Sequence, residues 1–360
     1  MISRRSVPFI AFTMAVIPTV LWIGCTKKPA PRPARSTMPI GARVEIPTPL
    51  GLPPVPIPPD NPPTAETIAL GRRLYYDTAL SVDHTISCAS CHDPKFGFSD
   101  GHQFSDGVRN QKGTRNAPTV FNAAYFTTQF WDGRAPSLEK QAEGPVQNPV
   151  EMAFTLEGVE KRLSADPSYQ AAFDKAFGPG PITYEMVEKC IASFERTVIS
   201  GNSPFDRYFY GGDKKALSES AKRGLEVFRN PKKGDCAACH LIGDKYALFM
   251  DNKFHNIGIG AETEQLADLG RFMVTHIDSD RGAFKTPSLR NIALTAPYFH
   301  DGSRKTIKDA IDFYIGGGNS NPHLDKEIHV LDFLTGKERA DLQAFLESLT
   351  GEIPPNVGAP

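Results

Sequence analysis

The chain has 360 residues, with 40 Lys and Arg against 41 Asp and Glu and a formal net charge of -1. This length is sufficient for two domains, each with a hydrophobic core of its own. A charge balance so close to zero argues against nucleic acid or an anionic membrane surface as a partner.

The N-terminal residues have the pattern of a secretory signal. Arg4 and Arg5 form a charged start, and an apolar run follows from residue 7 to residue 23. We therefore expect residues 1–24 to be a signal peptide and the mature protein to be periplasmic.

A proline-rich segment follows, from residue 25 to residue 63. Its composition favours extended polyproline II over a packed core and predicts a semi-rigid linker, although a disordered leader has the same composition. Cys25 stands where a bacterial lipobox cysteine is modified, but Trp22 occupies a position where Leu or Val is usual. Lipid anchoring at Cys25 and loss of this cysteine with the cleaved peptide both agree with the sequence.

Two Cys-x-x-Cys-His runs occur in the chain, Cys88-Ala-Ser-Cys91-His92 and Cys236-Ala-Ala-Cys239-His240. In each run the two cysteines can hold a haem by thioethers, and the histidine can bind its iron as the proximal ligand. A zinc site made from two CxxC pairs is the alternative, but such pairs lie about 15–20 residues apart. A whole domain separates these two, so the sequence predicts two covalently bound haem c groups.

Each haem motif follows a short amphipathic stretch that contains a glycine. Residues 70–75 precede the first motif and residues 223–228 precede the second, which suggests a weak internal repeat. We expect Gly71 and Gly224 to let a helix approach the porphyrin closely.

Apolar residues on one helical face predict a buried helix between the motifs, with Cys190 as a core thiol: Met186, Val187, Cys190, Ile191, Phe194 and Val198. Thr335 and Glu338 form a capping box that opens a terminal helix. No long alternating strand pattern is present. We expect a mostly α protein made of two cytochrome c-like haem domains with long loops, residues 64–200 and residues 201–352.

Further motifs follow one another along the folded region: Arg115-Asn116-Ala117-Pro118-Thr119, Phe130-Trp131-Asp132-Gly133-Arg134, Gly144-Pro145, Asn148-Pro149-Val150-Glu151-Met152, Leu289-Arg290-Asn291 and Thr295-Ala296-Pro297-Tyr298-Phe299-His300-Asp301-Gly302. Together with the two haem runs, they resemble the bacterial di-haem cytochrome c peroxidase family, including its MauG-like branch. The resemblance implies that the first haem meets hydrogen peroxide and that the second stores and relays electrons.

Two positions depart from the peroxidase branch and match the MauG-like one. Val108 stands in place of the histidine that caps the resting first haem, and valine cannot bind iron; His102 is the nearest other histidine. Tyr314 stands in place of the methionine that caps the second haem, so the resemblance implies that Tyr314 is an iron ligand. A core tyrosine is the alternative, because Ile307, Ile311 and Tyr314 share one helical face.

The resemblance also implies the catalytic residues. Glu151 occupies the position of the family's distal acid–base group, and Gln141 and Pro145 are expected to shape the same pocket. Trp131 is expected to carry electrons between the two haems, although a core aromatic is the commoner use of tryptophan.

A calcium ion between the domains is implied in the same way. The matching positions are Asn116, by its side chain, and Thr295 and Pro297, by their backbone carbonyls. His255 recurs in the MauG-like pattern, and we expect a structural histidine there.

The sequence therefore favours an oxidoreductase that consumes hydrogen peroxide. Its electrons could come from a small c-type cytochrome or a copper protein, as in a peroxidase, or from a side chain of a partner protein, as in MauG-like oxidation. The alternative of a different class is a two-haem electron-transfer cytochrome without catalysis, against which the vacant distal site and Glu151 argue.

Overall fold

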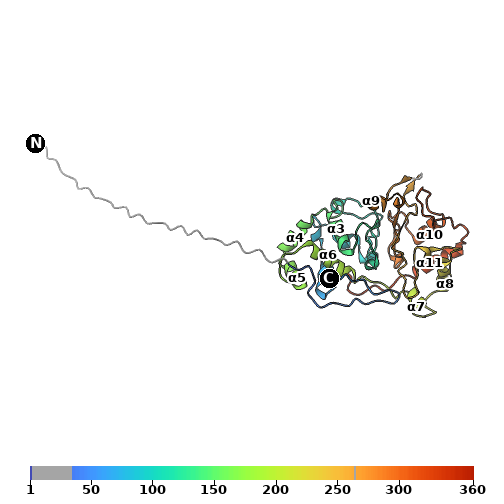
Figure 1. The fold of residues 1–360 in the computed structure, drawn as a ribbon, viewed down its shortest axis with the longest axis horizontal. Coiled ribbons are helices and arrows are strands. Elements are labelled where there is room, and N and C mark those ends of the chain that lie inside the picture. The colour runs from blue at the N-terminus through green and yellow to red at the C-terminus, as the bar shows by residue number, and fades with distance from the viewer. Residues whose placement is uncertain (2–34, 263–264) are drawn as a thin grey trace. The chain divides into compact units, whose positions relative to one another are not determined.

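A computed structural model describes the chain apart from residues 2–34 and 263–264. The expected signal peptide and Cys25 lie outside the described residues. Residues 35–360 belong to one compact unit (Figure 1). Within the described part, no helix has both the length and the apolar character needed to cross a membrane.

The compact unit is mostly helical and rich in long loops, as expected. Its described α-helices are α1 (Ala65–Tyr76), α2 (Cys88–Cys91), α3 (Leu138–Gln147), α4 (Leu156–Ala165), α5 (Pro167–Phe177), α6 (Tyr184–Glu195), α7 (Pro204–Phe209), α8 (Glu219–Arg229), α9 (Phe272–Thr275), α10 (Ile307–Ile315) and α11 (Gly336–Glu347). Four two-residue strands form two antiparallel pairs, β1 (Phe254–His255) with β4 (Phe284–Lys285) and β2 (Ala261–Glu262) with β3 (Gln265–Leu266).

Two helix pairs repeat the same close contact. A Cβ on Gly71 of α1 would lie 1.8 Å from the carbonyl oxygen of Cys190 on α6, and a Cβ on Gly224 of α8 would lie 1.9 Å from that of Asp341 on α11. Only glycine permits such an approach. The expectation that these glycines face the porphyrins was therefore wrong, because each gives its space to another helix.

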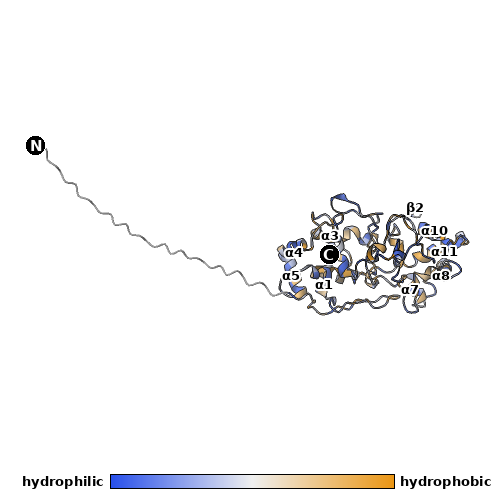
Figure 2. Cartoon of the chain, turned by 45° about the horizontal axis from the view of Figure 1, so that its top comes forward, coloured by the Kyte–Doolittle hydropathy of each residue, from blue (hydrophilic) through white to orange (hydrophobic). Residues whose placement is uncertain are grey.

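The two helix pairs carry separate hydrophobic clusters. One contains Leu70, Leu74 and Cys190, and the other contains Leu225 and Phe345. Figure 2 shows hydrophobic segments, in orange, along the helices of the compact unit. The expected apolar face of α6 is buried, and so is the thiol of Cys190. The second cluster includes the apolar side of α11, whose predicted capping box is present as reciprocal hydrogen bonds between Thr335 and Glu338.

The described part of the proline-rich segment, residues 35–63, is extended and packs on the rest of the compact unit rather than standing away from it as a stalk (Figure 1). The backbone N–H of Ile40 donates to the carbonyl of Ala176 at the end of α5, and the hydroxyl of Tyr125 donates to the carbonyl of Pro53. Composition alone missed this docking, because the contacts use backbone oxygens and a few apolar side chains such as Leu52.

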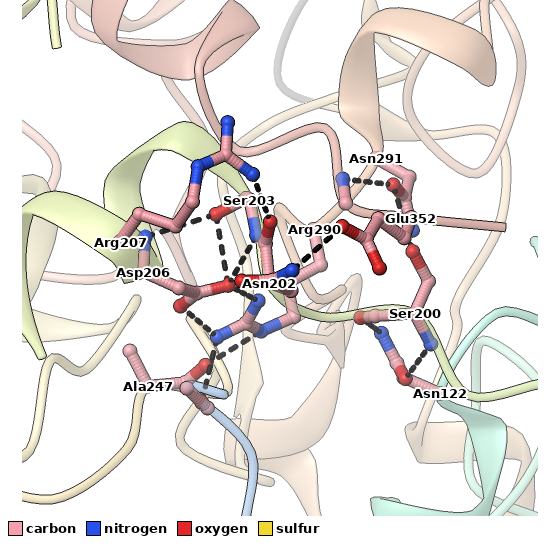
Figure 3. Close-up of polar contacts among 12 residues, drawn as sticks. Asn122, Ser200, Asn202, Ser203, Asp206, Arg207, Ala247, Arg290, Asn291 and Glu352 are labelled. Atoms are coloured by element: carbon pink, nitrogen blue, oxygen red, sulfur yellow. Dashed lines mark hydrogen bonds and ion pairs between the residues drawn. The ribbon is translucent and has the colours of Figure 1, made fainter. Parts of the chain in front are cut away.

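A buried ion pair holds the proline-rich segment at Gly51. The guanidinium of Arg290 donates to both carboxylate oxygens of Asp206 at 2.8 Å, to the carbonyl of Gly51 at 2.7 Å and to that of Ala247 at 2.7 Å (Figure 3). Both side chains are almost completely buried. Arg290 therefore ties the N-terminal segment to α7 and to the loop that follows the second haem motif.

Candidate functional site

The first Cys-x-x-Cys-His run forms the single helical turn α2. The hydroxyl of Ser90 accepts from the backbone N–H of Ser87, which starts the turn, and the N–H of His92 donates to the carbonyl of Cys88 at 2.9 Å. The Nδ1 atom of His92 lies 3.2 Å from the carbonyl oxygen of Phe98. A protonated Nδ1 donates to that oxygen and leaves Nε2 as the metal-binding atom.

The second run repeats this geometry. The N–H of His240 donates to the carbonyl of Cys236 at 2.9 Å, and Nδ1 of His240 lies 2.8 Å from the carbonyl oxygen of Phe249. Burial lowers the pKa of both His92 and His240, which favours the neutral imidazole that an iron ligand must be.

The cysteines of both runs are unpaired and available for thioether bonds. Burial raises the pKa of the Cys91 thiol to about 11 and that of Cys236 to about 12, so neither environment favours the thiolate that zinc requires. The one candidate metal cluster of the described residues joins Cys239 to Asp251 and His255, not one CxxC pair to the other. This donor set fits two haem c groups and not the zinc alternative.

A cavity with mostly apolar walls adjoins the second run. Cys236, Cys239 and His240 lie on its wall, and α10 contributes Ile311 and Tyr314. Burial raises the pKa of Tyr314, with Cys239 as the next contributor, and its phenol has no hydrogen-bond partner among the described residues. The helical face that holds Tyr314 thus forms part of the wall of this cavity.

Glu151 follows α3 and is held by its neighbours. The side-chain amide of Asn148 donates to Oε1 of Glu151 at 2.6 Å, which leaves Oε2 free of protein partners among the described residues. Burial raises the pKa of Glu151, against the opposing effects of the Asn148 hydrogen bond and the charge of Arg134. A partly buried carboxyl with a raised pKa and one oxygen without a partner among the described residues is suited to proton transfer.

Val108 lies directly beside Glu151. Its backbone N–H donates to the carbonyl of Glu151 at 2.8 Å, and its side chain is fully buried. The preceding Gly107 is so close to this turn that a Cβ would lie 1.8 Å from the carbonyl oxygen of Val150. His102 is exposed, which does not favour it as a substitute ligand.

Other predicted pocket residues lie on α3. Gln141 and Pro145 are one helical turn apart, and the amide of Gln141 has no hydrogen-bond partner within the described residues. The ring of Phe130 lies against Gly144, where a Cβ would be 2.8 Å from its Cζ, and the guanidinium of Arg134 lies 3.5 Å above the centre of this ring. Phe130 therefore approaches α3 from the loop that also carries Trp131.

Trp131 lies on the wall of the cavity that adjoins the second Cys-x-x-Cys-His run. Its indole Nε1–H donates to the carbonyl of Asn116 at 2.8 Å. The three predicted calcium positions, Asn116, Thr295 and Pro297, line the same cavity. The carbonyls of Thr295 and Pro297 accept none of the hydrogen bonds found among the described residues, so they remain available to a cation.

His255 bridges two acidic residues at the cavity wall. Its Nε2 lies 3.0 Å from Asp251 and its Nδ1 lies 2.5 Å from Asp325. A hydrogen bond to Cys239, followed by those to the two carboxylates, raises the pKa of His255 to about 10. A thioether at Cys239 removes the first of these causes and leaves the carboxylates, in keeping with the expected structural role.

Sequence reasoning missed the groups that orient the predicted residues. The carbonyls of Phe98 and Phe249 hold the two histidines, and backbone acceptors leave no signal in the sequence. Asn148 was visible only as part of a motif, although its spacing of three residues from Glu151 could have indicated the hydrogen bond. The sequence also gave no indication that Lys285 of β4 is buried, because nothing in its local pattern distinguishes it from the other lysines.

Comparison with known proteins identifies the family to which this chain is similar. A family model described as di-haem cytochrome c peroxidase matches residues 65–215. The methylamine utilization protein MauG of Methylorubrum extorquens is 42% identical over 301 residues, which cover 83% of this chain and 82% of the relative. The cytochrome c551 peroxidase of Pseudomonas aeruginosa is 40% identical over 291 residues, 79% of each chain.

Solved structures share the fold. A MauG-like protein associated with microbial copper homeostasis is 34% identical, with a TM-score of 0.76 over 87% of this chain and 98% of the other. The diheme peroxidase BthA of Burkholderia thailandensis has a TM-score of 0.68 over 89% of this chain and 97% of the other, at 23% identity.

Proposed function

The chain belongs to the di-haem cytochrome c peroxidase family, and we propose that it uses peroxide at a first haem whose iron has His92 as its only protein ligand. The family makes the chain a peroxidase-like di-haem oxidoreductase. The observation that carries the proposal is the burial of Val108 beside Glu151, which puts a side chain without a ligand atom next to the acid–base group.

The thioether bonds of the first haem would come from Cys88 and Cys91, and His92 would be its proximal ligand. When bound, this haem supplies an iron that binds peroxide and takes up its two oxidising equivalents. Glu151 moves the proton that O–O cleavage requires, accepting it from one peroxide oxygen at Oε2 and returning it to the other. Asn148 fixes the carboxylate through Oε1, and the free amide of Gln141 is available to orient peroxide.

The second haem would be held by Cys236, Cys239 and His240, with Tyr314 as the sixth ligand. Burial opposes ionisation of a free phenol, so Tyr314 becomes a phenolate only when a metal takes its oxygen. An anionic oxygen favours ferric iron, which makes this site a poorer electron acceptor than one capped by methionine. Trp131, on the wall of the same cavity, would carry electrons between the two sites.

Two uses of the oxidising equivalents remain, and each has a relative that supports it. Oxidation of a side chain in a partner protein agrees with Val108, Tyr314 and the 42% identity to a MauG. Peroxidase action with a small c-type cytochrome or a copper protein as donor agrees with the 40% identity to a cytochrome c551 peroxidase. We favour the first, because both ligand positions follow the MauG-like pattern.

The remaining assignments complete the proposal. The two haem domains would be residues 64–200 and residues 201–352, with one calcium ion held by Asn116, Thr295 and Pro297 between them. A periplasmic location follows from the expected signal peptide.

Peroxide consumption with and without a donor tests the enzyme against the electron carrier. The two-haem protein is mixed with hydrogen peroxide in the presence of a reduced small c-type cytochrome, and both reactants are followed. We expect peroxide to be consumed and both haems to be oxidised beyond the ferric state even without the donor. Peroxide that leaves both haems unchanged, with or without donor, would establish the electron-carrier alternative.

A further inference from the structure

Lys285 is a buried lysine that crosses from β4 to the loop carrying Trp131. Only 7% of its surface is exposed. Its backbone N–H donates to the carbonyl of Trp131 at 2.8 Å, and its Nζ donates to the carbonyl of Thr128 at 2.7 Å. The same Nζ lies 3.9 Å from the centre of the Phe126 ring. Lys285 thus holds the Trp131 loop at three points.

The ammonium of Lys285 has no ion-pair partner among the described residues. The charge of Asp132 acts on the Lys285 ammonium, but Asp132 already contacts Arg115 at 2.6 Å and Arg134 at 3.0 Å. The other charged or titratable groups on the elements around Lys285 are His255 with Asp251 and Asp325, His300, Arg271 and Asp268. None of these makes a hydrogen bond to Nζ.

A buried ammonium with one carbonyl acceptor and an aromatic ring is poorly compensated. Burial accordingly lowers the pKa of Lys285 to about 7, and Asp132 only partly opposes this. We therefore expect the positive charge that Lys285 holds against the Trp131 loop to be present in mildly acidic solution and to be lost as the pH rises through about 7.

We propose that Lys285 is a positioning residue that controls, through its charge, how readily Trp131 gives up an electron. This inference rests on the proposed role of Trp131 as the bridge. A nearby positive charge disfavours removal of an electron from the indole and stabilises the reduced form of a neighbouring redox centre. Loss of the charge reverses both effects.

The electron balance is simple. Trp131 gives one electron to the first site after peroxide has oxidised it, and Trp131 receives one from the second site. No bond forms or breaks, and the indole keeps its proton, because Nε1–H remains hydrogen-bonded to the carbonyl of Asn116. Lys285 exchanges its own proton with solvent and takes no electron.

The midpoint potential of the second haem tests this without peroxide. Spectroelectrochemical titrations at pH 5.5 to 9 compare the wild type with Lys285→Met, which is always neutral, and Lys285→Arg, which is always charged. We expect the wild-type potential to follow that of Lys285→Arg at low pH and that of Lys285→Met at high pH. Lys253→Met is the control for loss of one positive charge, because Lys253 is exposed and directly precedes β1.

If the midpoint potential of the second haem changes with pH in parallel in all three proteins, the proposal is overturned. The haem propionates and other histidines would then account for the entire pH dependence of the potential. If Lys285→Met does not assemble, wild type and Lys285→Arg still decide: the two must agree at pH 5.5 and separate at pH 9. Because the titration needs no peroxide, its failure is distinct from a failure of the proposed function.

A double-mutant cycle tests the connection to Trp131. The rate of electron loss from the reduced second haem after peroxide is added is measured at pH 6, where the wild-type lysine is charged. We expect Lys285→Met to raise this rate at least about threefold with Trp131 present and by a smaller factor in Trp131→Phe, where only the direct effect on the second haem remains. An equal effect in both backgrounds would show that Lys285 does not act through Trp131.

Discussion

Replacement of Glu151 by glutamine should remove proton transfer while leaving the local fold in place. The glutamine oxygen can still accept from Asn148, whose amide lies 2.6 Å from Oε1, and the turn next to Val108 depends on backbone atoms. Acid–base groups contribute about 10²–10⁴ in rate, or about 2.7–5.4 kcal/mol at about 1.36 kcal/mol per decade. We expect the reaction of the ferric protein with peroxide to slow by that factor.

The pH dependence of the rate of the peroxide reaction is a second, independent test of Glu151. Burial raises the pKa of Glu151, and only the ionised carboxylate can accept the first proton, so the wild-type rate should rise as pH increases through that pKa. Glutamine cannot titrate, so this rise should disappear. Stopped-flow absorbance of both haems measures the rate, and Glu157→Gln on the exposed side of α4 is the matched control. A Glu151→Gln protein with both haems and the wild-type rate would refute the assignment.

Three further predictions follow from the same geometry. Tyr314→Phe should change the absorption and magnetic resonance spectra of the second haem, and Tyr314→Met should raise its potential; an unchanged spectrum in the phenylalanine variant would leave Tyr314 a wall residue. Arg290→Met strands the buried carboxylate of Asp206 and should lower the free energy of unfolding by about 3–5 kcal/mol in denaturant titrations, whereas Lys308→Met at an exposed pair should cost less than about 1 kcal/mol. Asn116→Ala should weaken calcium binding in a chelator competition, and identical affinity would remove Asn116 from the ligand set.

Local patterns in the sequence predicted local structure well. The two Cys-x-x-Cys-His runs, the capping box at Thr335 and the buried helix around Cys190 each depend on residues within one or two helical turns. Helical spacing also placed Tyr314 on the correct face of α10. What spacing could not reveal was whether that face meets a packed core or a cavity.

Contacts between distant segments were the part that could not be predicted. Gly71 was assigned to the porphyrin because the sequence does not say which backbone approaches a helix, and in the structure that backbone is α6. The docking of residues 35–63 was missed for the same reason. Lys285 acquires its environment from three positions more than 150 residues earlier in the chain, and no local pattern can report such a neighbourhood.

The most direct measurement of the central claim is the electron paramagnetic resonance spectrum of the ferric protein as isolated. Val108 provides no ligand atom beside Glu151, so we expect one high-spin centre for the first haem and one low-spin centre for the second. Val108→His introduces an imidazole at that position and should convert the high-spin signal to low-spin. Two low-spin centres in the wild type would mean that another residue caps the first iron, and the proposed open site for peroxide would be wrong.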